Sequence, residues 1–575
     1  MLSNKNLFFY VVFLLLGLCV AYGGTLDVPF YLDDRSSITH NPYFEDSSVA
    51  YLFEVYGMRG IGYVSLWLNY LYGSTEPAGY HFVNLVIHFL NGLLVCFFIT
   101  KLLKLAYPDV EAKLPLLVGM SAGLLFLLHP LNSQSVIYVV QRLASLVTLF
   151  YLMSLLSYLN ARTSQTQTNS TIWMVVCVLS AALALFTKQN SITLPIAILL
   201  IEIVLFKTIR LRYPLIIGAL IVFGFFLGLN ILDEGSLLHR IDDATRESDE
   251  YSRLEYLLVQ SSIITLYLQK FLIPTNLHLD YGLSLSSFSE FQKVSALVIH
   301  LCLISVAIIF RRKVPLLSFS VLLFYLLHIV ESGVIPITDL AFEHRTYLPN
   351  AAILLFLATV LTKLFSSSAG ETKNYYQIIV PTLLLAFVYL WLTIDRVNEW
   401  KDPKTFYTKE LERSPKNVRS LHNFAEYLIR EGNMTNDKVR AGVLLDSMYE
   451  NSNGKLDAVM VNTHIVYLMG TKEYKKARKL GEGLLKQPLH PLVRDLVNEN
   501  LGVIYTTLGN YSKALEVFSS IRRFEKVKPT SRIAYSFALY RMNKKEKALQ
   551  VAQSILGIEP NNEKAKELIQ LIQTR

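Results

Sequence analysis

Over about the first 395 residues, long apolar runs alternate with short polar segments, and a charge-rich stretch follows them. A run of about 20 apolar residues, counted with its flanks, can cross the roughly 30 Å of hydrocarbon in a bilayer. The pattern predicts an all-α fold: a membrane helical bundle of about 11 spans over residues 1–395, and a soluble domain over residues 396–575. The expected spans are residues 7–22, 82–103, 116–128, 136–159, 172–186, 192–206, 215–232, 296–310, 316–330, 348–364 and 378–394.

Basic loops orient these spans, because Lys and Arg concentrate on the cytoplasmic side of short loops. Placing residues 101–113 and 311–313 inside puts the amino terminus inside and the charge-rich domain outside. The apolar stretch 256–273 would reverse this order if it crossed, so we expect it to be a re-entrant or interfacial helix. Five polar clusters then share the outer face: residues 33–34, 129–130, 188–190, 278–280 and 343–345.

The soluble domain repeats itself from about residue 414. Ala514 and Ala548 are 34 residues apart, which is the tetratricopeptide period, and Ala477 belongs to an earlier copy. Small residues at such positions let paired helices approach closely. The repeats predict an α-solenoid whose concave face suits a polypeptide segment, although a scaffold without a catalytic role is the alternative for each residue.

Composition agrees with a membrane protein. The chain is 52% hydrophobic and 17% charged, whereas soluble domains carry about a quarter of charged residues. We attribute the net charge of +9 to Lys and Arg in loops that orient helices, and expect no nucleic-acid partner. The four cysteines lie far apart in apolar runs and predict neither a disulfide framework nor a zinc site. The first run is expected to be a retained anchor, with a cleaved signal peptide as the alternative.

Several motifs occur in a fixed order along the membrane domain. They include Leu32-Asp33-Asp34, Tyr80-His81-Phe82, Leu128-His129-Pro130, Phe186-Thr187-Lys188, Glu331-Ser332-Gly333 and Glu343-His344-Arg345. With this series the chain resembles the transmembrane-and-tetratricopeptide-repeat O-mannosyltransferases and their bacterial relatives, which are GT-C glycosyltransferases. The resemblance implies a polyprenyl-phosphate-linked sugar as donor and transfer to a hydroxyl outside the cytoplasm.

Two positions depart from the family. Gln134 stands where animal members of the family tend to carry Glu, and Gln189 follows Lys188 where a Glu is usual. These departures suggest a bacterial-type branch, in the inner membrane with the repeats in the periplasm, and they leave the sugar open.

The residues suit such a transfer chemically. A Ser or Thr hydroxyl is a poor nucleophile, so a carboxylate must accept its proton, and Asp33 or Asp34 is placed to do so. Single displacement inverts the anomeric carbon. The leaving lipid phosphate needs fixed cations. The candidates for binding it are Arg142, Arg345, His344, Lys188 and His129, with Arg59, Asp280 and Glu343 in supporting positions.

Structural alternatives stand beside these roles. The alternative for Asp33-Asp34 is a structural salt bridge within the loop, the alternative for His129 is a cap at a helix junction, and the alternative for Glu343 is a local pair with Arg345. His81, Asn84, His88 and Asn91 share one helical face, and they fit bonding between helices better than metal binding. No metal site is predicted, and a divalent cation, Mg²⁺ or Mn²⁺, held by Asp33 or Asp34 is an open alternative.

Three functions compete. The leading hypothesis is an integral-membrane protein O-glycosyltransferase whose repeats present an acceptor polypeptide. The second is transfer to a lipid or polysaccharide, and the third is a non-catalytic membrane assembly factor. The partners expected for the first are a polyprenyl-phosphate-linked sugar, the acceptor polypeptide and membrane lipid.

Overall fold

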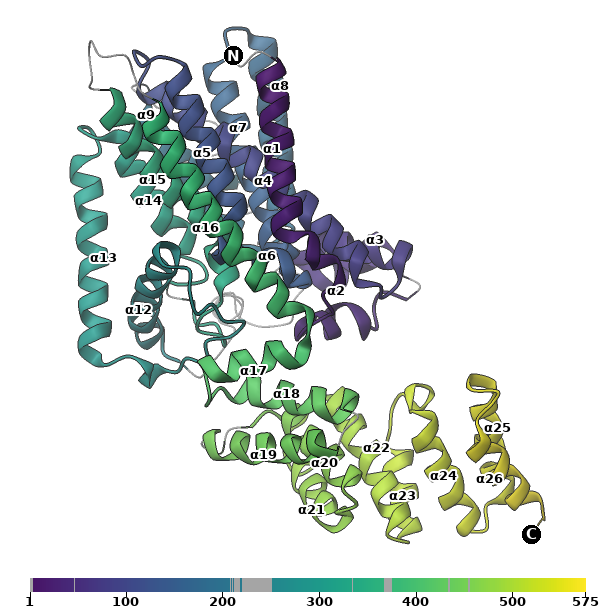
Figure 1. The fold of residues 1–575 in the computed structure, drawn as a ribbon. Coiled ribbons are helices and arrows are strands. Elements are labelled where there is room, and N and C mark those ends of the chain that lie inside the picture. The colour runs from purple at the N-terminus through teal and green to yellow at the C-terminus, as the bar shows by residue number, and fades with distance from the viewer. Residues whose placement is uncertain are drawn as a thin grey trace. The chain divides into compact units, whose positions relative to one another are not determined.

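A computed structural model describes residues 4–45, 47–206, 208, 210, 218–219, 251–333, 335–366, 375–432, 435–452, 454 and 456–574. Every regular element in this part of the chain is helical, as the apolar pattern predicts (Figure 1). The chain forms two compact units, Met1–Arg413 and Ser414–Arg575. The compositional change near residue 395 falls inside one helix, which ends at Lys401.

Unit 1 contains the apolar helices and some shorter, more polar ones. They are α1 (Asn4–Tyr22), α2 (Val49–Tyr56), α3 (Gly60–Gly73), α4 (Pro77–Ala106), α5 (Lys113–Leu128), α6 (Gln134–Ile137), α7 (Arg142–Thr163), α8 (Gln167–Leu185), α9 (Leu194–Leu205), α12 (Arg253–Leu272), α13 (Glu290–Phe310), α14 (Pro315–His328), α15 (Tyr347–Ser366), α16 (Tyr376–Lys401) and α17 (Pro403–Arg413).

Seven helices in the described residues are long and apolar enough to cross a membrane, or eight if a pair bent by 55° counts as one span. That pair is α5 and the segment Pro130–Ile137. The expected spans at 192–206 and 316–330 correspond to the shorter apolar helices α9 and α14. The expected span at 215–232 lies outside the described residues.

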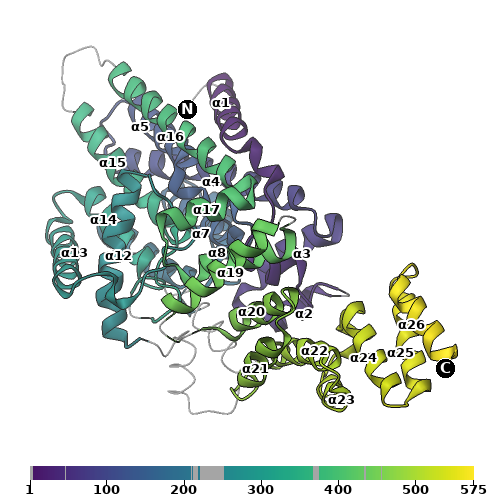
Figure 2. The same ribbon diagram turned by 60° about the horizontal axis from the view of Figure 1, so that its bottom comes forward.

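The stretch expected to be re-entrant or interfacial forms α12. It is not among the span-length apolar helices of the described chain, and it lies beside α13 in both ribbon views (Figures 1 and 2). Ser252 caps its first turn together with Glu255, which fixes where the helix begins.

Glycines bring α4 and α5 into close contact. A Cβ on Gly119 would lie 2.1 Å from Thr100 Oγ1, and one on Gly123 would lie 2.7 Å from the Gly92 carbonyl oxygen. Helices in lipid associate through such close packing, because the acyl chains are as apolar as the side chains and give no hydrophobic driving force for association. These small residues therefore set the spacing at the centre of the bundle.

A polar stripe on α4 bonds the bundle together. Asn84 Nδ2 donates to the carbonyls of Val136 and Val139, and His88 contacts the Leu127 carbonyl and the Tyr347 hydroxyl. The carbonyls of Leu127 and Val136 flank the break between α5 and α6, where helical bonds are missing. The stripe thus satisfies backbone groups freed by the bend, as bonding between helices predicts.

Unit 2 is a succession of paired helices, in which each helix contacts the next. They are α18 (Val418–Glu431), α19 (Thr435–Asn451), α20 (Ala458–Gly470), α21 (Tyr474–Leu484), α22 (Pro491–Thr507), α23 (Tyr511–Ser519), α24 (Pro529–Arg541), α25 (Lys545–Ile558) and α26 (Glu563–Thr574). Ala477, Ala514 and Ala548 are completely buried. At Gly502 a Cβ would lie 2.5 Å from the Phe518 ring, so the small residues of the repeat pattern lie where helices meet.

The origin of the positive charge differs from the expectation. Residues 414–575 carry 26 Lys and Arg against 16 Asp and Glu, a net charge of +10. Residues 1–413 carry 28 against 29, a net charge of −1. Loop residues that orient the spans therefore do not explain the charge of the chain, and the attribution made from composition is wrong.

Candidate active site

A cavity of about 380 Å³ lies in unit 1 among segments that are distant in sequence. Its charged side chains come from the segment after α1, the turn before α3, the turn after α8 and the segment between α14 and α15. They are Asp33, Arg59, Lys188, Glu331, Asp339 and Arg345. The volume falls in the range of pockets that hold small ligands. Of the predicted site residues, the cavity unites Asp33, Arg59, Lys188, His344 and Arg345.

Asp33 and Asp34 occupy different environments. Asp33 is exposed and lines the cavity, whereas Asp34 is buried, with 1% of its surface exposed. Leu32, just before them, has a φ of +41°, a left-handed conformation that is costly for a residue with a side chain. The Asp33 N–H donates to the Tyr138 hydroxyl at 3.0 Å and helps to hold this conformation.

Asp34 ties the loop to the bundle. Its Oδ1 accepts the N–H of Val140 at 2.7 Å and its Oδ2 accepts the N–H of Tyr31 at 3.2 Å. Burial raises the pKa of the Asp34 carboxyl to about 8, and the two backbone N–H groups oppose this rise. Both oxygens are engaged within the protein, so Asp34 positions the loop while Asp33 faces the cavity.

Lys188 and Glu331 form an ion pair in the cavity wall, with Nζ 2.5 Å from Oε1. Both side chains are largely buried, at 11% and 13% exposed. Burial alone would raise the pKa of the Glu331 carboxyl, but Lys188 and Arg345 lower it below its usual value. A charged pair is therefore retained at the edge of the cavity, where a ligand anion can compete for the ammonium.

Arg345 closes the loop between α14 and α15. Its Nη2 donates to the Asp339 carbonyl at 2.7 Å, and its Nη1 donates to the carbonyls of Leu340 and Glu331 at 3.1 and 3.3 Å. These bonds fix the guanidinium in the wall while its positive charge still acts across the cavity.

Arg59, in the turn before α3, contacts the same site. Its Nε donates to Gln189 Oε1 at 3.3 Å, and the N–H of Ile61 donates to the Phe186 carbonyl at 2.8 Å. These contacts hold the start of α3 against the end of α8. The supporting role expected for Arg59 stays a prediction.

Arg142 does not line the cavity. It is completely buried at the start of α7, and its nitrogens donate to Asn84 Oδ1, Asn69 Oδ1 and the carbonyls of Ser65 and Tyr80 at 2.6 to 2.9 Å. Hydrogen bonds to a buried charge are worth more than neutral ones. The structure therefore gives Arg142 a role in joining α3, α4 and α7 and no contact with the cavity.

His129, Asp280 and Glu343 also lie outside the cavity lining. His129 caps a short turn: its Nδ1 accepts the N–H of Leu131, and its Nε2 bonds to the Phe271 carbonyl. Asp280 Oδ1 accepts the N–H of Gly282. Glu343 turns toward the loop at residues 277–281, so it does not form the local pair with Arg345.

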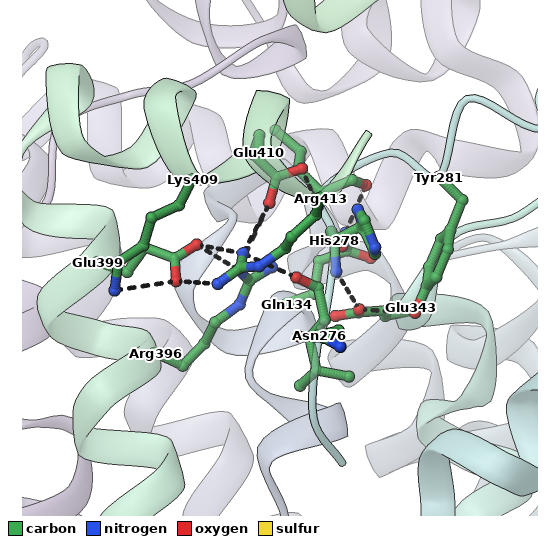
Figure 3. A network of polar contacts seen from close by, with 12 residues as sticks. Gln134, Asn276, His278, Tyr281, Glu343, Arg396, Glu399, Lys409, Glu410 and Arg413 are labelled. Carbon is green, nitrogen blue, oxygen red and sulfur yellow. Dashed lines mark hydrogen bonds and ion pairs between the residues drawn. The ribbon is translucent and has the colours of Figure 1, made fainter. Parts of the chain in front are cut away.

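That loop, residues 277–281, is held by side chains instead of by secondary structure (Figure 3). Glu343 Oε1 accepts the His278 N–H and the Tyr281 hydroxyl, and Glu410 Oε2 accepts the Leu279 N–H. The Leu277 carbonyl of the loop accepts a hydrogen bond from Arg413 Nη1. The loop supports the helical turn that carries His344 and Arg345.

Glu331 and Asp339 are cavity residues to which sequence reasoning gave no role. Glu331 directly follows the apolar run at 316–330, as Asp33 follows the first run at some distance. A carboxylate at the exit of a span favours water or a polar cavity, and this signal could have identified Glu331.

In the described residues, no group of three or more His, Cys, Asp or Glu side chains is arranged to hold a metal ion.

Comparison with known proteins agrees with the resemblance. The chain is 24% identical over 455 residues to a protein O-mannosyl-transferase of Caenorhabditis elegans, an alignment covering 75% of this chain and 62% of that protein. It is 23% identical over 415 residues to human protein O-mannosyl-transferase TMTC4, covering 64% and 54%. Human TMTC3 is 29% identical over 137 residues, covering 24% and 13%.

The chain thus spans less than two thirds of the length of these relatives. No protein-family model matches it.

Proposed function

We propose that this chain is an integral-membrane GT-C glycosyltransferase. It moves a sugar from a polyprenyl phosphate to Ser or Thr hydroxyls of an exported polypeptide, with inversion. The observation that carries the proposal is the cavity in which the exposed carboxylate of Asp33 shares one space with Arg59, Lys188 and Arg345. The similarity to proteins named O-mannosyl-transferases supports it.

Asp33 is the base in this reaction. The acceptor oxygen attacks the anomeric carbon, its proton passes to the Asp33 carboxylate, and the bond from the anomeric carbon to the phosphate oxygen breaks with its electron pair. Lys188 and Arg345 stabilise the phosphate that leaves. Asp34, Arg142, His129, Asp280 and Glu343 act indirectly, through the backbone and helices that hold these groups.

The repeats present the acceptor in this proposal. The paired helices of unit 2 and the small residues buried between them support a tetratricopeptide solenoid. A cavity of about 720 Å³ lies among α19, α20 and α21, lined by the rings of Tyr449, His464 and Tyr467 among others. Such a groove suits the side chains of an extended polypeptide.

The membrane that holds the protein is a separate part of the proposal. The relatives named above are animal proteins. The bacterial-type branch, with the repeats in the periplasm, stays a prediction that depends on Gln134 and Gln189. The side of the membrane is common to both cases, since the donor phosphate and the exported acceptor meet outside the cytoplasm.

The test uses the purified full chain in nanodiscs. It is given a polyprenyl phosphate carrying radiolabelled mannose, or another sugar in parallel, and a Ser/Thr-containing polypeptide. We expect label on the polypeptide, with the anomeric configuration inverted. Label only on lipid would favour the lipid acceptor, and absence of turnover with every sugar in wild-type protein would overturn the enzyme proposal.

A further inference from the structure

The side chain of His344 has one ring nitrogen bound to the protein and the other free of such bonds. Its Nδ1 lies 3.0 Å from Gln134 Oε1, and its backbone N–H donates to the same oxygen at 2.8 Å. Nε2 makes no hydrogen bond to the described residues, and the side chain lines the cavity. Phe342 stacks on the imidazole at 5.1 Å and helps to fix the ring plane.

The orientation of the Gln134 amide follows from two independent contacts. Its Nε2 donates to the carbonyls of Leu279 and His278 at 2.8 and 3.3 Å, and carbonyl oxygens only accept. Its Oε1 receives the backbone N–H of His344, which only donates. A flipped amide would break both sets of bonds, so the atom beside the imidazole is the oxygen.

An oxygen beside Nδ1 requires the proton on Nδ1, and in a neutral imidazole the lone pair is then on Nε2. We infer that His344 presents Nε2 to the cavity as a hydrogen-bond acceptor for a hydroxyl of the donor sugar, and that Gln134 is the positioning residue that fixes this tautomer. This assignment rests on the proposed function. It replaces the role of phosphate-binding cation that the sequence assigned to His344.

The charges around the imidazole favour its neutral form. The cations lining the same cavity are Arg59, Lys188 and Arg345, and the carboxylates are Asp33, Glu331 and Asp339. Glu331 is paired with Lys188, while Glu343 directs Oε1 to His278 and Tyr281. Since His344 is buried and its sequence neighbour is Arg345, a further positive charge on the imidazole is disfavoured.

A sugar hydroxyl is the group that fits this position. Lys188 and Arg345, which hold the donor phosphate in the proposed function, line the cavity together with His344. The sugar is attached to that phosphate, so its hydroxyls reach the same wall. A hydroxyl donates one hydrogen bond, and the Nε2 lone pair accepts it.

The test compares the pH dependence of kcat/KM in the wild type and three full-length variants in nanodiscs. Gln134→Glu places a carboxylate beside Nδ1, which favours the imidazolium, so its acid limb should move up by about 1 pH unit or more. The double variant Gln134→Glu/His344→Gln should lose that displacement, because Gln does not titrate. Gln189→Glu adds the same charge elsewhere in the cavity and should displace the limb much less.

Substitution of His344 itself gives the second measurement. His344→Gln retains a side-chain oxygen that can accept the hydroxyl, so it should keep about tenfold more kcat/KM than His344→Ala. With a deoxy-sugar donor that lacks the bound hydroxyl, the difference in kcat/KM between His344→Gln and His344→Ala should become smaller. A change of acceptor polypeptide should leave this difference unchanged. The thermal unfolding midpoint of each variant shows whether the variant is as stable as the wild type.

A working wild-type enzyme could still contradict the assignment. If His344 acted as a cation, activity would fall as pH rises through its pKa, and Gln134→Glu would extend activity to higher pH. That result, or equal activity of His344→Gln and His344→Ala, would overturn the inference while leaving the proposed function standing. Absence of transfer by wild-type protein at every pH would instead count against the proposed function.

Discussion

Arg142 and Lys188 are both cations held inside unit 1, yet their surroundings differ. Four hydrogen bonds join Arg142 to α3 and α4, and it is completely buried. Lys188 has one ion pair, with Glu331, and lines the cavity. A buried charge whose donors are engaged by the protein builds structure, whereas a charge with donors left over beside a cavity can bind a ligand.

The two carboxylates at the start of the chain repeat this contrast. Asp34 has both oxygens bound to backbone N–H groups, while Asp33 is exposed to the cavity. Adjacent residues of the same type therefore fall on opposite sides of the distinction. Substitution of one member of each pair tests whether this distinction between structural and ligand-binding charges holds.

The largest effect is expected for Asp33→Asn. Loss of a general base lowers kcat by about 10² to 10⁴-fold, and the exposed side chain should leave folding unaffected. Transfer to the polypeptide and the melting temperature in nanodiscs measure the two effects. Asp109→Asn, an exposed residue in the loop after α4, is the matched control; full activity of Asp33→Asn would end the proposed role of this carboxylate.

Arg142→Met should act on stability instead. It leaves Asn84, Asn69 and two carbonyls without their donor, which should cost on the order of 3 kcal/mol of unfolding free energy. Yield after membrane extraction and the thermal unfolding midpoint check this. If the variant were stable but failed to bind donor, Arg142 would belong with the cavity cations, and the distinction drawn above would break.

Lys188→Met should show the reverse pattern. We expect kcat/KM for the donor to fall by roughly 10 to 10²-fold, because a charge-assisted contact to phosphate is worth about 1.5–3 kcal/mol. Thermal stability should change less than in Arg142→Met. Glu331→Gln removes the ion pair but leaves the Lys188 ammonium in place, so it distinguishes loss of the cation from loss of the pair. This variant should bind the donor more tightly than Lys188→Met.

The smallest effect is expected for Asp34→Asn, which should lower the free energy of unfolding by about 1 kcal/mol at acidic pH, because Asn retains only one of the two acceptor oxygens. Burial raises the pKa of Asp34 to about 8, so the stability that its protonation contributes is complete below the unfolded pKa, near 4, and is lost as pH rises through 8. Wild type should therefore lose stability relative to Asp34→Asn between pH 5 and pH 9.

Thermal unfolding of both proteins across this range gives the comparison. A wild type that gains on the variant as pH rises would mean that the N–H groups of Val140 and Tyr31 outweigh burial.

Periodicity predicted much of the fold and some of the site. Apolar runs located most helices, since lipid demands internally bonded helices, and carboxylates at span exits pointed to Asp33. Arg142 could not be assigned in this way, because Asn69 and Asn84, which engage it, are far away in sequence. The tautomer of His344 likewise depends on Gln134, 210 residues earlier. The sequence shows which side chains are charged, but it does not show which of their hydrogen-bond donors are engaged by other residues of the folded protein.

The loop at residues 277–281 has a consequence for biogenesis. Its partners Glu410 and Arg413 leave the ribosome more than 120 residues after it, at the very end of unit 1. Until they arrive, the nascent segment has backbone groups with no fixed partner, and the turn that carries His344 lacks its support. A chain that stops in α16 could thus insert its helices and still be recognised by quality control as unfinished.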